Sequence, residues 1–266
     1  MKYETVDIQI EQGTCVVWLN RPEVRNAFNE TMIAELTAAF AEIDGNDALR
    51  AVVLAGRGKS FCAGGDVNWM KRMAGLSVEE NRTGAMAMAA MLNRLYTMKK
   101  PTVARVHGAA FAGGMGLAAA CDIAVASADA EFCVSEVRLG LIPATISPYV
   151  LAAAGERAAH RYFLTAERIT AAEARRIGLV HEVVQPEDLD ATVSKICGNL
   201  VQGAPGAHAA AKELIRSVAR KAVTPELVAD TADRIAAAWA SDEGKEGIRS
   251  FLEKRAPAWR QSLQVS

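Results

Sequence analysis

The stretch Arg105–Glu136, RVHGAAFAGGMGLAAACDIAVASADAEFCVSE, decides the fold and points to a site. In it the glycine pair Gly113-Gly114 opens an apolar helical run, and a carboxylate, Glu136, ends the stretch. The first N–H groups of a helix have no partner within it and lie at the positive end of its dipole. A carbonyl oxygen near Gly113 would be stabilised there as it gains negative charge, and glycine lets it approach the backbone. The pattern predicts an oxyanion hole and one acid–base group.

A second glycine turn, Ser60–Asp66 (SFCAGGD), supports this interpretation. It follows the apolar run Ala51–Ala55 and can offer another inward N–H, which we assign to Ala63. Either turn alone is weak evidence, because corners between strands and helices often use glycine for steric reasons. Together they supply the two donors that an oxyanion hole needs.

Four motifs are spread over nearly the whole chain: Asn20-Arg21-Pro22 with Asn26-Ala27-Phe28, then SFCAGGD, VHGAAFAGGMGLAAACD and SEVRLGLIP. Together they resemble the enoyl-CoA hydratase/isomerase (crotonase) superfamily. The resemblance implies an α/β fold: a crotonase-like spiral core of repeated strand-strand-helix units, followed by a C-terminal helical region. More narrowly, Asp66–Met73 and Ile142–Tyr149 are similar to the bacterial methylglutaconyl-CoA and isohexenylglutaconyl-CoA hydratases.

Composition limits the remaining classes. A chain of 266 residues that is 51% hydrophobic can bury one substantial core. We expect this core, with the CoA-thioester site, over residues 1–200, and a helical oligomerisation region over residues 201–266. A net charge of −1 offers no basic face, so we expect neither nucleic acid nor membrane as a partner. The resemblance implies a homotrimer or a hexamer made of two trimers.

The cysteines and the N-terminus suggest the compartment. Five cysteines, an odd number, lack metal-ligand spacing, which predicts reduced thiols and no metal site. The N-terminal segment MKYETVDIQI has no apolar core of the signal-peptide type. We therefore expect a cytoplasmic protein.

Hydrophobic periodicity and turn residues predict the elements. A hairpin about Gln12-Gly13 opens the chain. The predicted strands are Val6–Ile10, Cys15–Leu19, Ala51–Leu54, Thr102–Val106, Ile123–Val125, Ala130–Val134 and His181–Val184. The predicted helices are Glu30–Ile43, Asn81–Tyr96, Glu156–Leu164, Ala171–Ile177, Asp188–Leu200, Pro205–Ala219, Pro225–Ala238 and Glu243–Lys254.

By motif position, the resemblance implies that Ala63 and Gly113 are the oxyanion donors and that Glu136 is a catalytic glutamate. Glu136 lies between two apolar runs, which predicts partial burial and a raised pKa suited to proton transfer. Without the motif, a surface glutamate paired with Arg138 is the simpler interpretation.

The resemblance also implies contacts with the CoA part of the substrate, and no separate cofactor. The implied residues are Arg25, Ala63, Gly64, Gly65, Asp66, Gly113 and Lys254. Arg25 and Lys254 would lie near the phosphates and the adenosine, although each is an ordinary exposed base by sequence alone. Asp66 is equally well explained as the N-cap of a helix that begins at Val67.

One departure from the family pattern bears on the reaction. In hydratases with two glutamates, the first glutamate lies three residues after the oxyanion glycine. Here that position is Gly116. We predict hydration of a 3-branched glutaconyl-CoA, methyl or isohexenyl, in leucine or acyclic terpene breakdown. The distal carboxylate of such a substrate would help to orient water and would meet a cation such as Arg138, Lys71 or Arg72.

Two alternatives remain open at this stage. A Δ3-Δ2-enoyl-CoA isomerase needs only one carboxylate, and a catalytically idle acyl-CoA-binding protein needs none. Met86, Met88 and Met91 could widen a pocket for a long acyl tail, or could be plain core.

Overall fold

The computed structural model describes residues 3–261. Its strands are β1 (Val6–Glu11), β2 (Thr14–Leu19), β3 (Ala51–Gly56), β4 (Thr102–Val106), β5 (Ala109–Phe111), β6 (Ile123–Ser127), β7 (Glu131–Cys133), β8 (Ile169–Thr170) and β9 (Glu182–Val184). Its α-helices are α1 (Glu30–Asp44), α2 (Val67–Met73), α3 (Val78–Thr97), α4 (Gly113–Ala120), α5 (Ser147–Thr165), α6 (Ala171–Arg176), α7 (Leu189–Leu200), α8 (Pro205–Val218), α9 (Pro225–Ala240), α10 (Asp242–Leu252) and α11 (Ala258–Gln261). Short 3₁₀ helices are η1 (Pro22–Val24), η2 (Glu136–Leu139) and η3 (Pro186–Asp188).

The larger sheet has the strand order β1-β2-β3-β4-β6-β9. Its first pair is the predicted hairpin, in which Gln12 and Gly13 both adopt positive φ, as a two-residue turn between antiparallel strands requires. From β2 onward the neighbouring strands run parallel, so each connection passes through a helix or a loop that returns to the same edge. The predicted α/β fold with a C-terminal helical region is confirmed.

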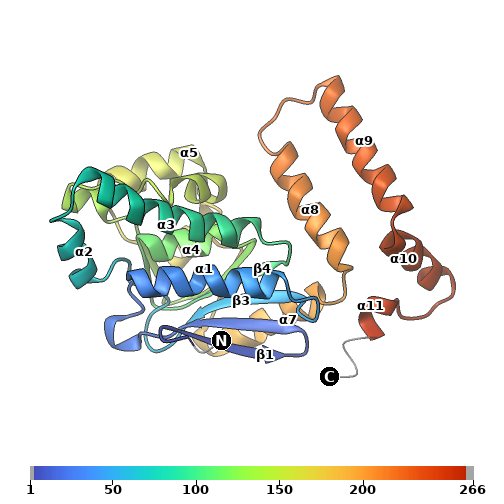
Figure 1. Ribbon diagram of the computed structural model, residues 1–266, viewed down its shortest axis with the longest axis horizontal. Coiled ribbons are helices and arrows are strands. Elements are labelled where there is room, and N and C mark those ends of the chain that lie inside the picture. Colours follow the sequence, from blue (N-terminus) through green and yellow to red (C-terminus); the bar gives the residue numbers. More distant parts are fainter. Residues whose placement is uncertain (1–2, 262–266) are drawn as a thin grey trace.

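Both faces of this sheet are covered. Helices α1, α3, α4 and α5 lie over one face and α7 lies under the other (Figure 1). The main apolar core fills the first interface, while Val53, Val103 and Val125 pack on Leu189 and Val193 of α7 in the second. Coverage on both sides explains why β3 is buried along its whole length and reads as an unbroken apolar run.

The smaller sheet, β5-β7-β8, positions the site. β5 and β7 are parallel, with Phe111 opposite Cys133, so α4 and η2 leave the sheet side by side at one edge. The glycine turn after β3 joins the same edge, because Cys62 forms an isolated parallel bridge with Ala110. Three chain segments that are distant in sequence therefore meet where the predicted site residues lie.

Of the C-terminal helices, α8 contacts the core through Lys212, which pairs with Asp122 at 2.6 Å. In Figure 1, α8 and α9 extend away from the sheet, and α10 lies on the opposite side of the molecule from α2. No residue of α9 is buried. Within the described range, no helix is both long and apolar enough to cross a membrane.

Helix α5 differs from the prediction. It begins at Ser147, not at Glu156, and a non-helical residue, Gly155 with φ 79°, interrupts it. Pro148 occupies the first turn, where a proline costs no hydrogen bond. This proline was the sequence signal for a helix start at Ser147. Gly155 interrupts the helical pattern, so the segment before it was not predicted as part of the same helix.

Candidate active site

The N-terminus of α4 packs tightly on the glycine turn Ser60–Asp66. A Cβ atom added to Gly114 would lie 2.3 Å from the carbonyl oxygen of Cys62, which no side chain tolerates. Gly64 of the turn adopts φ 100° and lies against Ala112, which precedes α4. The two glycine motifs are thus brought together as the sequence predicts, and glycine at position 114 is required by this close approach.

Hydrogen bonding decides which N–H groups of the turn are free. The N–H of Ala63 donates to the carbonyl of Arg25 at 3.0 Å, so it is engaged within the protein. The N–H of Gly65 has no hydrogen-bond partner among residues 3–261. The structure therefore does not support Ala63 as the second donor, and the free donor of this turn is Gly65.

Gly113, the other predicted donor, lies at the N-terminus of α4. Gly113 is the first residue of α4, so its N–H has no acceptor within the helix. The preceding residue, Ala112, adopts φ 47° and ψ −118° while its N–H donates to the carbonyl of Cys133 at 2.7 Å. This strained residue turns the chain sharply from β5 into α4.

Glu136 begins η2, beside α4, and its environment is unusual for a carboxylate. Its Oε2 atom is buried and has no hydrogen-bond partner. Burial raises the pKa of Glu136, and the backbone N–H groups of Glu136 and Ser135 oppose that rise only in part. Arg138 is exposed, and neither it nor any other base in the described residues forms an ion pair with Glu136. The simpler surface interpretation of this glutamate is therefore wrong.

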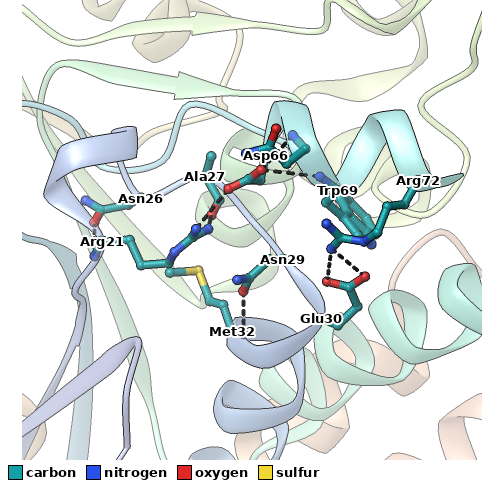
Figure 2. Close-up of polar contacts among 10 residues, drawn as sticks. Arg21, Asn26, Ala27, Asn29, Glu30, Met32, Asp66, Trp69 and Arg72 are labelled. Carbon is teal, nitrogen blue, oxygen red and sulfur yellow. Dashed lines mark hydrogen bonds and ion pairs between the residues drawn. The ribbon is translucent and has the colours of Figure 1, made fainter. Parts of the chain in front are cut away.

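Asp66 is the N-cap of α2, as one of the two sequence interpretations held. Its Oδ1 accepts from the N–H groups of Asn68 and Trp69, at 2.8 and 3.3 Å. Its Oδ2 accepts from the Arg21 guanidinium at 2.8 Å, and both side chains are largely buried (Figure 2). The hydrogen bond from Arg21 is the main reason that the pKa of Asp66 is lowered. These contacts fix the turn that carries Gly65.

Asn26 is a supporting residue whose role the sequence did not reveal. It is fully buried, and its amide donates to the carbonyls of Arg57 and Ser60 and accepts from the N–H of Arg21. It therefore ties the segment after β2 to the start of the glycine turn. Arg25 and Asn26, which follow η1, both adopt positive φ, and this turns the chain toward Arg57 and Ser60.

The remaining predicted binding residues are distributed unevenly. Arg25 is exposed and adjoins the turn, because its own carbonyl accepts from Ala63. Lys254 follows α10, which lies far from α2 within one chain (Figure 1). Among the cations considered for a distal carboxylate, Arg72 is already paired with Glu30 at 2.7 Å (Figure 2).

The methionine run on α3 is mostly core. Met91 is fully buried and Met88 nearly so, while Met86 is exposed. The Met88 Cε lies 2.9 Å from where a Cβ on Gly113 would be, so this side chain closes in on the N-terminus of α4.

Comparisons with known proteins agree with this geometry. The family model described as Enoyl-CoA hydratase/isomerase matches residues 9–262. The chain belongs to the enoyl-CoA hydratase/isomerase family. A crotonyl-CoA hydratase of Syntrophomonas wolfei is 34% identical over 96% of this chain and 97% of its own. A short-chain-enoyl-CoA hydratase of Clostridium acetobutylicum is 33% identical over 96% and 97%.

Solved structures support the same assignment. The crystal structure of an enoyl-CoA hydratase from Shewanella pealeana superposes with a TM-score of 0.94, at 38% identity and covering 97% of each chain. The spiral crotonase-type core is therefore confirmed, and this family member is an enzyme of the enoyl-CoA hydratase type, a hydro-lyase.

Proposed function

We propose that this enzyme adds water to the double bond of a 3-branched glutaconyl-CoA, with Glu136 as its acid–base group. The observation that carries the proposal is the Oε2 atom of Glu136, which is buried and has no hydrogen-bond partner, beside the free N–H groups of α4. The motifs Asp66–Met73 and Ile142–Tyr149 support the choice of a branched glutaconyl substrate. Such a substrate brings a second carboxylate, which the protein lacks at Gly116.

The proposed reaction uses these groups in sequence. Glu136 takes a proton from water as the water oxygen bonds to C3 of the acyl chain. The electrons of the double bond move through C2 to the thioester oxygen, and the N–H groups of Gly65 and Gly113 stabilise the resulting enolate. The protonated Glu136 then returns its proton to C2, so that one water is added in total. A pKa raised by burial suits a group that must both accept and donate.

An isomerase is the second candidate, and the single carboxylate favours it. Moving a proton between two carbons of a 3-enoyl-CoA needs Glu136 and the two N–H donors but no water. CoA is in either case part of the substrate. We place its phosphates near Arg25 and the turn Gly64–Asp66, which adjoin the donor Gly65.

A direct assay separates the candidates. The purified protein is incubated with 3-methylglutaconyl-CoA, its isohexenyl homologue, crotonyl-CoA and a 3-enoyl-CoA, and the products are analysed by mass and chromatography. A gain of one water with the branched glutaconyl thioesters supports hydration. Isomerised product without added water makes the enzyme an isomerase, and turnover of none of them supports an idle acyl-CoA binder.

Glu136→Gln tests the residue. We expect turnover to fall by roughly 100-fold or more, since one positioned acid–base group contributes at least that much. The matched control is Glu131→Gln, because Glu131 lies on the neighbouring strand β7 but is a surface partner of Arg168. Equal activity in both variants would remove Glu136 from the mechanism.

We further propose that the C-terminal region joins copies of this chain into a trimer or a hexamer. Its helices present apolar side chains to solvent instead of burying them on their own core. These are Val228, Ile235, Trp239, Ile248, Phe251 and Leu252. A neighbouring copy would also bring Lys254 toward a CoA site that its own chain does not reach.

Light scattering on the purified protein tests the assembly. Trp239→Glu and Phe251→Glu are expected to lower the measured mass to that of a single chain. Ile10→Glu, an equally exposed apolar position on β1, serves as control. A wild-type mass equal to one chain would contradict the proposal.

A further inference from the structure

Gly116 and Ile146 are packed so closely that each restricts which residue can occupy the other position. A Cβ added to Gly116 would lie 2.2 Å from Ile146 Cγ2 and 2.8 Å from Ile146 Cβ. Both distances are shorter than real Cβ atoms show. Position 116 therefore cannot carry any side chain while Ile146 is present.

Rotation of Ile146 does not relieve the conflict. Turning χ1 moves Cγ2 but leaves the Ile146 Cβ where it is, and a β-branched side chain has few alternative rotamers. The backbone is also fixed, because the Ile146 carbonyl accepts from the N–H groups of Tyr149 and Val150 at the start of α5. Ile146 is 1% exposed and belongs to the main core.

The pair lies beside the acid–base group. Gly116 is in the first turn of α4, whose N-terminus leaves the small sheet next to η2 and Glu136. Helix α5, which Ile146 precedes, contacts both α4 and η2, and the N–H of Leu141 closes η2 by donating to the Glu136 carbonyl at 3.0 Å. An apolar side chain thus fills the space that a second side chain from α4 would need.

We infer that Ile146 is a specificity-determining residue: by holding position 116 as glycine, it restricts the site to one protein carboxylate and so to thioesters that carry their own. The inference rests on the proposed hydration, which it deepens. It predicts that a simple enoyl thioester such as crotonyl-CoA is a poor substrate because the protein cannot supply a second carboxylate, and that this limit is set by Ile146 as much as by Gly116.

A stability series tests the steric part without any substrate. Gly116→Ala is made in the wild type and in the Ile146→Val, Ile146→Ala and Ile146→Gly backgrounds, and each protein is unfolded in urea. Gly116→Ala should lower the urea midpoint equally in the wild-type and Ile146→Val backgrounds, because valine keeps both conflicting atoms. The midpoint should fall less with Ile146→Ala and rise with Ile146→Gly, because alanine is a better helix residue than glycine once the conflict is gone. Equal changes in all four backgrounds would overturn the inference.

A substrate series tests the specificity part. Gly116→Glu combined with Ile146→Gly should raise the ratio of crotonyl-CoA hydration to branched glutaconyl-CoA hydration by roughly 100-fold over Ile146→Gly alone. Gly116→Glu with Ile146→Val should not, since the glutamate has no room. If Ile146→Gly lowers the folded yield, Ile146→Ala replaces it, and a smaller rise in the ratio is then expected because alanine keeps one of the two conflicting atoms.

The outcomes separate the inference from the function on which it rests. A folded double variant whose substrate ratio is unchanged overturns the specificity role of Ile146. Failure of the proposed function shows instead in the wild type, as no addition of water to either branched glutaconyl thioester.

Discussion

Asp66 offers a test of how the site is held in place, because its two oxygen atoms have different tasks. Oδ1 caps α2 and Oδ2 accepts from Arg21. The side chains of Asp66 and Arg21 are 9% and 16% exposed. Loss of an N-cap costs about 1 kcal/mol, and loss of a charge-assisted hydrogen bond about 1.5–3 kcal/mol. Asp66→Ala should therefore destabilise the protein by about 2.5–4 kcal/mol. Asp66→Asn keeps the cap and should lose about 2 kcal/mol.

Thermal and urea unfolding measure both values. For a chain of this size each kcal/mol corresponds to roughly 2–4 °C in Tm, so Asp66→Asn should lower Tm by about 4–8 °C. Glu30→Gln is the matched control, since it breaks the exposed pair with Arg72, and we expect at most about 1 kcal/mol from it.

The pH dependence of the Asp66 effect has a defined sign. The pKa of Asp66 is lowered in the folded state, so its ion pair stabilises the protein above the ordinary aspartate pKa and is lost as the pH falls through the lowered one. The difference between wild type and Asp66→Asn should shrink at acid pH. A difference that persists unchanged in acid, or equal losses from Asn and Ala, would refute the assignment of separate roles to the two oxygens.

Three further predictions concern other buried groups. Because the pKa of Glu136 is raised in the folded state, the stability of the wild type should fall relative to Glu136→Gln as the pH rises from the ordinary glutamate pKa through the raised one. A difference in urea midpoint between the two proteins that is the same at both ends of that pH range would contradict this. All five cysteines are buried, and burial raises the pKa of Cys15 and Cys62 to about 12. A thiol reagent at neutral pH should therefore label none of them in the folded enzyme and all five after unfolding. Rapid labelling of the native protein would contradict this. Lys212 of α8 pairs with Asp122 at 2.6 Å. A double-mutant cycle of Lys212→Met and Asp122→Asn should therefore give a coupling energy of about 1–3 kcal/mol. Additive losses of stability would mean that this pair does not hold α8 on the core.

Neighbouring residues in the sequence were enough to predict most of the helices and strands and to select the candidate site residues. Alternation and the Gln12-Gly13 turn predicted the β1–β2 hairpin, which the structure confirms. The glycine pair at Gly113 predicted the start of α4, and Glu136 was identified as a carboxyl between apolar runs. These inferences depend on neighbours in the chain, so local propensity and spacing were sufficient.

Which N–H groups are free became clear only from the folded chain. Ala63 and Gly65 look alike in sequence, but the Ala63 N–H donates to Arg25, whereas the Gly65 N–H has no partner among residues 3–261. Likewise, nothing near Gly116 indicates that Ile146 fills the space beside it. Hydrogen-bond competition and steric exclusion act between segments that are distant in the chain, so their outcome is fixed only when the fold brings those segments together.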